Sequence, residues 1–180
     1  MPLGGSVAAC EGNGAIYIDQ AVRPGTSWRL RDHDDQSRMS HGGSMPAGAE
    51  VPDSHRHLLD TDTAILATNG PDGLPQVTAI AFYHDKDDDL VKISLNDTRQ
   101  KSKNLRRDPN VTLFILDPDN RLRSLEIRAT AEVIPDPDKS FCATAGSKYN
   151  ADFSRHDRPG ETRSQIVLHP TRVNATDLSA

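Results

Sequence analysis

The residues best suited to chemistry lie between Asn96 and Pro109, where five basic side chains directly follow a strand-like segment. Asn96, Asp97 or Thr98 can cap a short helix here, and Pro109 helps to end it. The first amides of a helix have no intrahelical partner, and together with nearby Arg and Lys side chains they bind anions. The segment therefore predicts a cradle for a phosphate or a similar anion.

Other interpretations of the charged and metal-binding residue types are open at this point. Spacing alone favours a solvated helix face, because Arg99, Lys103 and Arg106 fall on one side of the expected helix. No metal site is expected, since His55 and His57 have no third ligand nearby.

Composition limits the classes of protein and of partner. The chain has 180 residues, is 35% hydrophobic and carries a formal charge of -5, which fits one soluble domain with some disordered sequence. A basic cluster on an acidic chain favours a defined anion over nucleic acid. No apolar run approaches the roughly 20 residues that span a bilayer, so no membrane association is expected. Cys10 and Cys142 show no metal spacing and no signal peptide precedes them, which favours a reducing, cytoplasmic setting.

The chain divides near residue 51. Residues 1–50 hold eight of the 12 glycines and show no sustained helical or strand period, so we expect a disordered leader. One hypothesis is that the first ~40 residues are upstream sequence translated from a misplaced start. Residues 51–180 are expected to form the folded domain.

Six strand-like segments alternate with turn signals in the expected domain. The clearest is Leu125 to Val133, where apolar and polar residues alternate without a break. Val111 to Leu116 is apolar on both faces, which suits a strand between a barrel interior and a second packed surface such as another subunit. Short helices are expected after Asp53 or Ser54, within the basic segment, and from Asp136 to about Tyr149. The pattern predicts a mainly β protein, a small closed antiparallel barrel with strands at residues 63–68, 76–83, 90–95, 111–116, 125–133 and 165–169.

Several ordered motifs carry a family resemblance over about residues 53 to 178. In chain order they are Leu66-Ala67-Thr68, the run from Gly70 to Thr78, Asn104 to Pro109, Leu125 to Arg128, Lys148-Tyr149 and Asp157 to Gly160. The chain resembles the pyridoxamine 5'-phosphate oxidase-like superfamily, and within it the branch described as deazaflavin-dependent (coenzyme F420) oxidoreductases. Related chains often carry aromatics after the Asp117-Pro118 turn, whereas this chain has Leu122 and Ser124.

The resemblance implies a six-stranded antiparallel split β-barrel of Greek-key type, which binds FMN or a deazaflavin at the interface of a homodimer. Of the five basic residues, the resemblance selects Arg99 and Lys101 as the ligands of the cofactor phosphate. Both also occupy the expected first turn of the helix, where an anion would bind. Asn104 and Lys103 would complete the phosphate end. Residues implied to contact the ring system are Gln76, Val77, Thr78, Ala79 and Ser94.

The implied activity is hydride transfer between a flavin-type cofactor, coenzyme F420 above all, and an unsaturated organic substrate. The alternatives are an FMN-dependent oxidase similar to pyridoxamine 5'-phosphate oxidase, and a non-catalytic protein that binds flavin, deazaflavin or haem. No catalytic residue is assigned from the sequence. Arg128, Tyr149 and His156 are the conceivable proton donors, besides solvent.

Overall fold

The computed structural model of the protein describes residues 49–179. The leader expected at residues 1–50 and its hypothetical misplaced start therefore lie outside the described residues, apart from positions 49 and 50. Within the described range none of the helices is long and apolar enough to cross a membrane. The elements in chain order are η1 (Asp53–Asp60), β1 (Ala64–Asn69), β2 (Pro75–Ile80), β3 (Tyr83–Asp85), β4 (Leu90–Asn96), α1 (Gln100–Arg107), β5 (Asn110–Leu116), β6 (Arg123–Pro135), α2 (Ser140–Ser147), η2 (Phe153–His156) and β7 (Arg163–Asp177).

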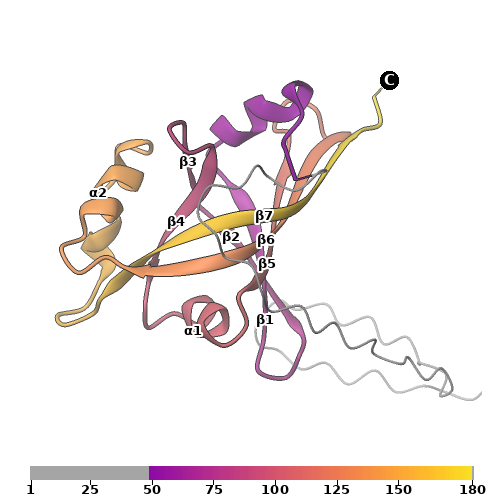
Figure 1. Ribbon diagram of the computed structural model, residues 1–180. Coiled ribbons are helices and arrows are strands. Elements are labelled where there is room, and N and C mark those ends of the chain that lie inside the picture. Colours follow the sequence, from indigo (N-terminus) through magenta and orange to yellow (C-terminus); the bar gives the residue numbers. More distant parts are fainter. Residues whose placement is uncertain (1–48, 180) are drawn as a thin grey trace, which may run out of the picture. The chain divides into compact units, whose positions relative to one another are not determined.

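The strands form one antiparallel sheet in the order β2-β1-β5-β6-β7-β4-β3. The sheet curls, and the long strands β6 and β7 run side by side through its middle (Figure 1). Its two edge strands, β2 and β3, follow one another in the chain but do not pair with each other. A curled sheet whose edges are not joined by hydrogen bonds fits a split barrel, so the predicted split-barrel fold class is confirmed. The closed barrel expected from the strand pattern alone was wrong, because the two edge strands do not pair.

The prediction of six strands was wrong by one, because the segment expected as a single strand at 76–83 is broken between Ile80 and Tyr83. At the break, the backbone N–H of Phe82 donates to Tyr149 Oη (2.8 Å). The Phe82 carbonyl accepts from Tyr149 Oη (2.7 Å) and from Lys148 Nζ (3.3 Å). Side chains distant in sequence thus satisfy the backbone that a continuous strand would have paired, and the chain passes from one edge of the sheet to the other.

The last strand is also longer than predicted, since β7 runs from Arg163 to Asp177 rather than over residues 165–169. Its pairing with β6 shifts register between Arg128 and Ala129, which pair with Arg172 and Pro170. Proline has no N–H for the ladder and is tolerated at a bulge. Thr171 is the extra residue there, and its hydroxyl donates to the Arg128 carbonyl (3.1 Å). The proline therefore bends the strand without ending it.

The core lies on the inner face of the curled sheet. The alternation of buried and exposed residues along β6 shows which side chains belong to it. Leu125, Ile127, Ala129 and Ala131 are buried, while the residues between them face away. The outer face of β5 is different, because Phe114 is 37% exposed and Leu116 is 47% exposed. β5, the strand that was predicted to be apolar on both faces, thus has one row of buried side chains and one row of side chains that the described residues leave exposed.

The predicted helix starts need correction. The N-cap of α1 is Arg99 rather than Asn96, Asp97 or Thr98, because Asn96 Oδ1 already accepts from the Thr98 amide (2.9 Å). Helix α2 begins at Ser140, later than predicted. Asp136 still serves its N-terminus, since its carboxylate accepts from the Cys142 amide (2.9 Å). Pro52, not Asp53 or Ser54, precedes η1.

Candidate functional site

A cavity of about 520 Å³ opens between the β2 edge, the end of β4, the start of α1 and the segment that carries η2. The elements supply different chemistry. The β2 edge contributes small and apolar groups, including Ile80 and Ala81, and β4 contributes Ser94. The start of α1 contributes cations and free helix amides. The full lining is Gln76, Ala79, Ile80, Ala81, Ser94, Leu95, Asn96, Arg99, Gln100, Lys101, Phe153, His156 and Arg163.

The charge of this lining has one sign. Arg99, Lys101 and Arg163 line the cavity together with His156, and no carboxylate of the described residues lines it. Burial lowers the pKa of Lys101, and the charge of Arg99 lowers it further. A cation whose pKa is depressed by a second cation gains free energy when an anion binds beside both. The cavity is therefore suited to an anionic ligand with an apolar part.

Five of the nine predicted cofactor residues line this one cavity. The two predicted phosphate ligands, Arg99 and Lys101, lie at the start of α1. Gln76 and Ala79 come from β2, and Ser94 comes from β4. β2 ends the hydrogen-bonded order on one side and β4 lies next to the last strand on the other, and both contribute to the cavity because the Ala81-Phe82 link joins the two sheet edges.

The other four predicted residues lie outside the lining. Asn104 is fully buried, and its amide nitrogen donates to Gln76 Oε1 (3.0 Å) and Thr68 Oγ1 (3.0 Å). It is placed to orient Gln76 rather than to meet a ligand. Lys103 is exposed on α1, Val77 is 58% exposed on β2, and Thr78 is half-buried.

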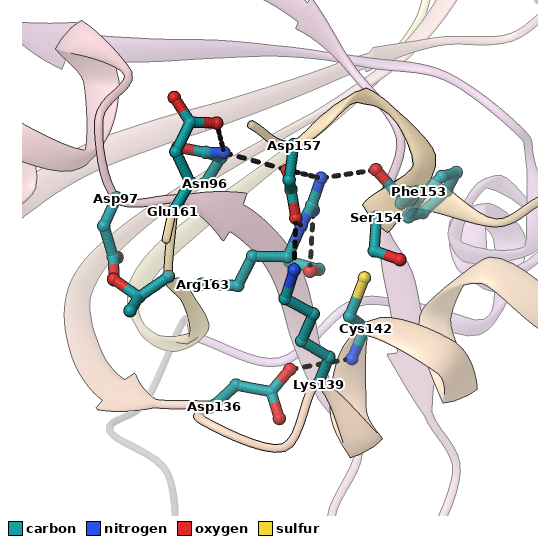
Figure 2. Close-up of polar contacts among 12 residues, drawn as sticks. Asn96, Asp97, Asp136, Lys139, Cys142, Phe153, Ser154, Asp157, Glu161 and Arg163 are labelled. Carbon is teal, nitrogen blue, oxygen red and sulfur yellow. Dashed lines mark hydrogen bonds and ion pairs between the residues drawn. The ribbon is translucent and has the colours of Figure 1, made fainter. Parts of the chain in front are cut away.

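The segment 152–162 supplies residues that sequence reasoning did not assign to the cofactor site, namely Phe153 and, just beyond it, Arg163. Arg163 pairs with Asp157 through two hydrogen bonds, from Nε to Oδ2 (2.8 Å) and from Nη2 to Oδ1 (2.9 Å). Their side chains are only 8% and 4% exposed. Lys139 Nζ also reaches Asp157 (3.0 Å), as Figure 2 shows. The sequence marked this loop through the Asp157 to Gly160 motif of the family resemblance, which identifies no partner for Asp157.

These contacts fix the protonation of the pair. Hydrogen bonds from Arg163 hold the pKa of Asp157 far below its usual range against the opposing effect of burial, and Asn96 and Lys139 act in the same direction. Asp157 is therefore a permanent carboxylate at neutral pH, and it is no candidate for proton transfer.

The three conceivable proton donors lie in different places. The Tyr149 hydroxyl is engaged with the Phe82 backbone, and burial raises its pKa. Arg128 lines a separate, smaller hollow with Thr171 and pairs with Glu126 (3.0 Å). Of the three, His156 lines the cavity.

The fold and cavity define a class: a split-barrel protein with a cation-lined site at the junction of the barrel edges. Residues 51–177 match the profile of the pyridoxamine 5'-phosphate oxidase family, and the chain belongs to this family. The predicted resemblance is thereby confirmed. The family is one of oxidoreductase-like proteins with flavin-type cofactors.

Solved structures agree with this assignment. One named as an F420 reductase is 33% identical, covers 69% of this chain and 98% of its own, and superposes with a TM-score of 0.60. A conserved hypothetical protein from Mycobacterium tuberculosis is 21% identical over 75% of this chain and 90% of its own, with a TM-score of 0.58. A putative pyridoxamine 5'-phosphate oxidase from Listeria innocua is 19% identical over 71% and 98%, with a TM-score of 0.54. The last two demonstrate a shared fold only.

Proposed function

We propose that this protein is an oxidoreductase that binds coenzyme F420 in the cation-lined cavity and acts on an unsaturated organic substrate, with FMN as the alternative cofactor. The observation that carries the proposal is the convergence of Arg99 and Lys101 on an apolar-walled cavity that no described carboxylate lines. The choice of F420 over FMN is supported by the structure named as an F420 reductase, at 33% identity.

The residues of the cavity fit a flat ring with a phosphate-bearing tail. Arg99 and Lys101 would bind the phosphate beside the first amides of α1. Ala79, Ile80 and Ala81 offer a narrow apolar edge for a ring, and Asn104 holds Gln76 at the same edge. Such a cofactor, when bound, supplies the hydride chemistry. The chain's own part is to fix the orientation of the ring and to keep water away.

A homodimer would complete the site. The outer face of β2, β1 and β5 is apolar: Ala67 pairs with Val77, and Ile65 pairs with Ala79 and with Phe114. Contiguous exposed apolar side chains of this kind mark an interaction surface. Ala79 belongs both to this face and to the cavity lining. A partner subunit on this face would therefore cover one side of the bound ring.

Titration of the purified full chain with FMN and with coenzyme F420, followed by fluorescence, tests the proposal. Losing one charge-assisted phosphate contact in Arg99→Ala or Lys101→Ala should weaken binding by about 1.5 to 3 kcal/mol, roughly tenfold or more. Lys103→Ala is the matched control, because it removes the same charge from the same helix at an exposed position outside the cavity. Equal losses of affinity in all three variants would mean that only the overall positive charge of the helix matters, and would refute the assignment of Arg99 and Lys101 as phosphate ligands.

Turnover separates an enzyme from a binding protein. The enzyme must oxidise reduced F420 faster than a control without protein, across a panel of enones, quinones and tetrapyrroles. Binding without any such acceleration would favour the non-catalytic alternative, and tight FMN binding with no affinity for F420 would favour the FMN oxidase.

A further inference from the structure

Two walls of the cavity are joined by side chains at the end of β4. One wall is the start of α1, which carries Arg99 and Lys101. The other is the segment 152–162, which carries Phe153 and His156. Between them lies Asn96, the last residue of β4, which is 5% exposed and itself lines the cavity. Figure 2 shows its carboxamide directed at the carboxylates of the second wall.

The carboxamide of Asn96 uses both of its ends. Its Nδ2 donates to Asp157 Oδ1 (2.8 Å) and to Glu161 Oε2 (2.8 Å). Its Oδ1 accepts from the Thr98 amide (2.9 Å) and from Thr98 Oγ1 (2.7 Å), which orders the turn that leads into α1. An amide offers two donors and an acceptor from one short side chain. Aspartate has no donor when ionised and serine has one, so neither could make this set of bonds.

The neighbouring residue adds a second connection of the same kind. The Asp97 carboxylate accepts hydrogen bonds from Ser164 Oγ (2.8 Å) and from Thr162 Oγ1 (2.5 Å). The backbone N–H of Asp97 donates to the Thr162 carbonyl (3.0 Å). Arg106, in the last turn of α1, pairs with the same carboxylate (2.5 Å). The turn before α1 is thus fastened to the C-terminal end of the wall segment as well as to its middle.

We propose that Asn96 is a positioning residue: its carboxamide clasps the wall segment 152–162 to the turn before α1, so that the cation-lined cavity is formed before a ligand arrives. Without the two amide donors, Asp157 would keep its partners Arg163 and Lys139, but neither the Asp157 nor the Glu161 carboxylate would be hydrogen-bonded to the end of β4. The wall segment would then sample open positions, and ordering it would cost binding free energy. The consequence for cofactor affinity rests on the proposed function, whereas the clasp itself does not.

The test compares Asn96→Asp with Asn69→Asp in the full chain. Asn96→Asp keeps the acceptor used by Thr98, removes both donors and adds a charge beside two carboxylates. Asn69→Asp makes the same change at an amide that donates to a single carboxylate, Asp108 (2.7 Å), and lies outside the cavity. We expect Asn96→Asp to weaken binding of FMN and F420 by about tenfold or more at 25 °C, and Asn69→Asp by less than about threefold. Thermal unfolding establishes that each variant is folded at that temperature.

A second variant separates the clasp from bulk electrostatics. Glu161→Ala removes an acceptor of the Asn96 amide and also one negative charge, which by itself would strengthen the binding of an anion. We expect weaker binding despite the more positive charge. If Asn96→Asp does not fold, the cofactor affinity of Glu161→Ala tests the proposal by itself. Unchanged or tighter binding in Glu161→Ala would overturn the proposal.

Trypsin measures the clasp without any ligand. The exposed Arg155 lies in the wall segment, whereas cleavage after Arg158 is blocked by Pro159. Asn96→Asp and Glu161→Ala should release the fragment cut after Arg155 several times faster than wild type and Asn69→Asp do. Equal rates in all four proteins would overturn the clasp. If the wild type binds neither cofactor, the proposed function fails, and the cleavage rates still decide whether Asn96 holds the wall.

Discussion

Replacing Asp157 by Asn should destabilise the fold severely, although the change is nearly isosteric. The carboxylate accepts hydrogen bonds from Arg163, Lys139 and Asn96. Asparagine would remove the charge that balances a guanidinium only 8% exposed, and it would point N–H donors at other donors. Breaking one side of a buried ion pair typically costs about 3–5 kcal/mol, since the remaining charge stays buried without a partner.

The expected thermal shift follows from the size of the domain. For a folded unit of this size, a loss of about 3 kcal/mol lowers the unfolding midpoint by about 10 °C. The pH dependence has a definite sign. Because the folded-state pKa of Asp157 is depressed, its contribution is complete above the unfolded pKa of about 3.9 and is lost as the pH falls through the folded value. The stability gap between wild type and variant should therefore be full at pH 7 and narrow below about pH 4.

The matched control is Asp60→Asn, which breaks the pair with Lys86 (2.6 Å) where both side chains are 63% exposed. Exposed pairs contribute about 0–1 kcal/mol, so this variant should unfold close to wild type. Differential scanning calorimetry or urea titration of the three proteins at pH 7 and pH 3.5 measures the effect. If Asp157→Asn is as stable as Asp60→Asn at pH 7, the burial of the Arg163 pair has no energetic weight and the reasoning is refuted.

Three further outcomes are expected. FMN affinity should fall as the pH rises through the lowered pKa of Lys101, because its charge is then lost, and Lys101→Arg should keep affinity to higher pH in the same titration. Phe114→Glu should leave the monomer folded, yet yield a smaller species in analytical ultracentrifugation, if the outer face of β5 is the dimer surface. Gly146→Ala should lower the unfolding midpoint, since its methyl would lie 2.2 Å from the Ala151 carbonyl oxygen; an unchanged midpoint would mean that this loop shifts at no cost.

The fold was predictable because its strands alternate in a way that local physics enforces. The buried row at Leu125, Ile127 and Ala129 follows directly from the period of a strand. The break at Ala81-Phe82 was not predictable, because both residues suit a strand and the groups that satisfy the Phe82 backbone come from Lys148 and Tyr149. A local pattern cannot contain a hydrogen bond to a side chain more than sixty positions away.

The same limit applies to the candidate site: residues with a local sequence signal could be predicted, and residues that depend on distant contacts could not. Arg99 and Lys101 could be named because a basic helix start after a strand carries its own chemistry. Asn104 was placed among the ligands, yet it lies behind Gln76 in the structure, and only a contact with β2 reveals this. Asn96 suggested a helix cap from its residue type, and its larger set of bonds depends on how the loop before β7 folds back.

The two-residue link between β2 and β3 limits how the site can vary. From Ile80 to Tyr83 the chain makes three peptide steps, which span at most about 11 Å. Tyr149 and Lys148 fasten the middle of that link. The Ile80-Ala81 side of the cavity is therefore held by covalent geometry and by these hydrogen bonds, which limits how far it can move for a bulkier ligand. The segment 152–162 is joined to the other cavity walls through side chains, which makes it the place to randomise when altered ligand selectivity is wanted.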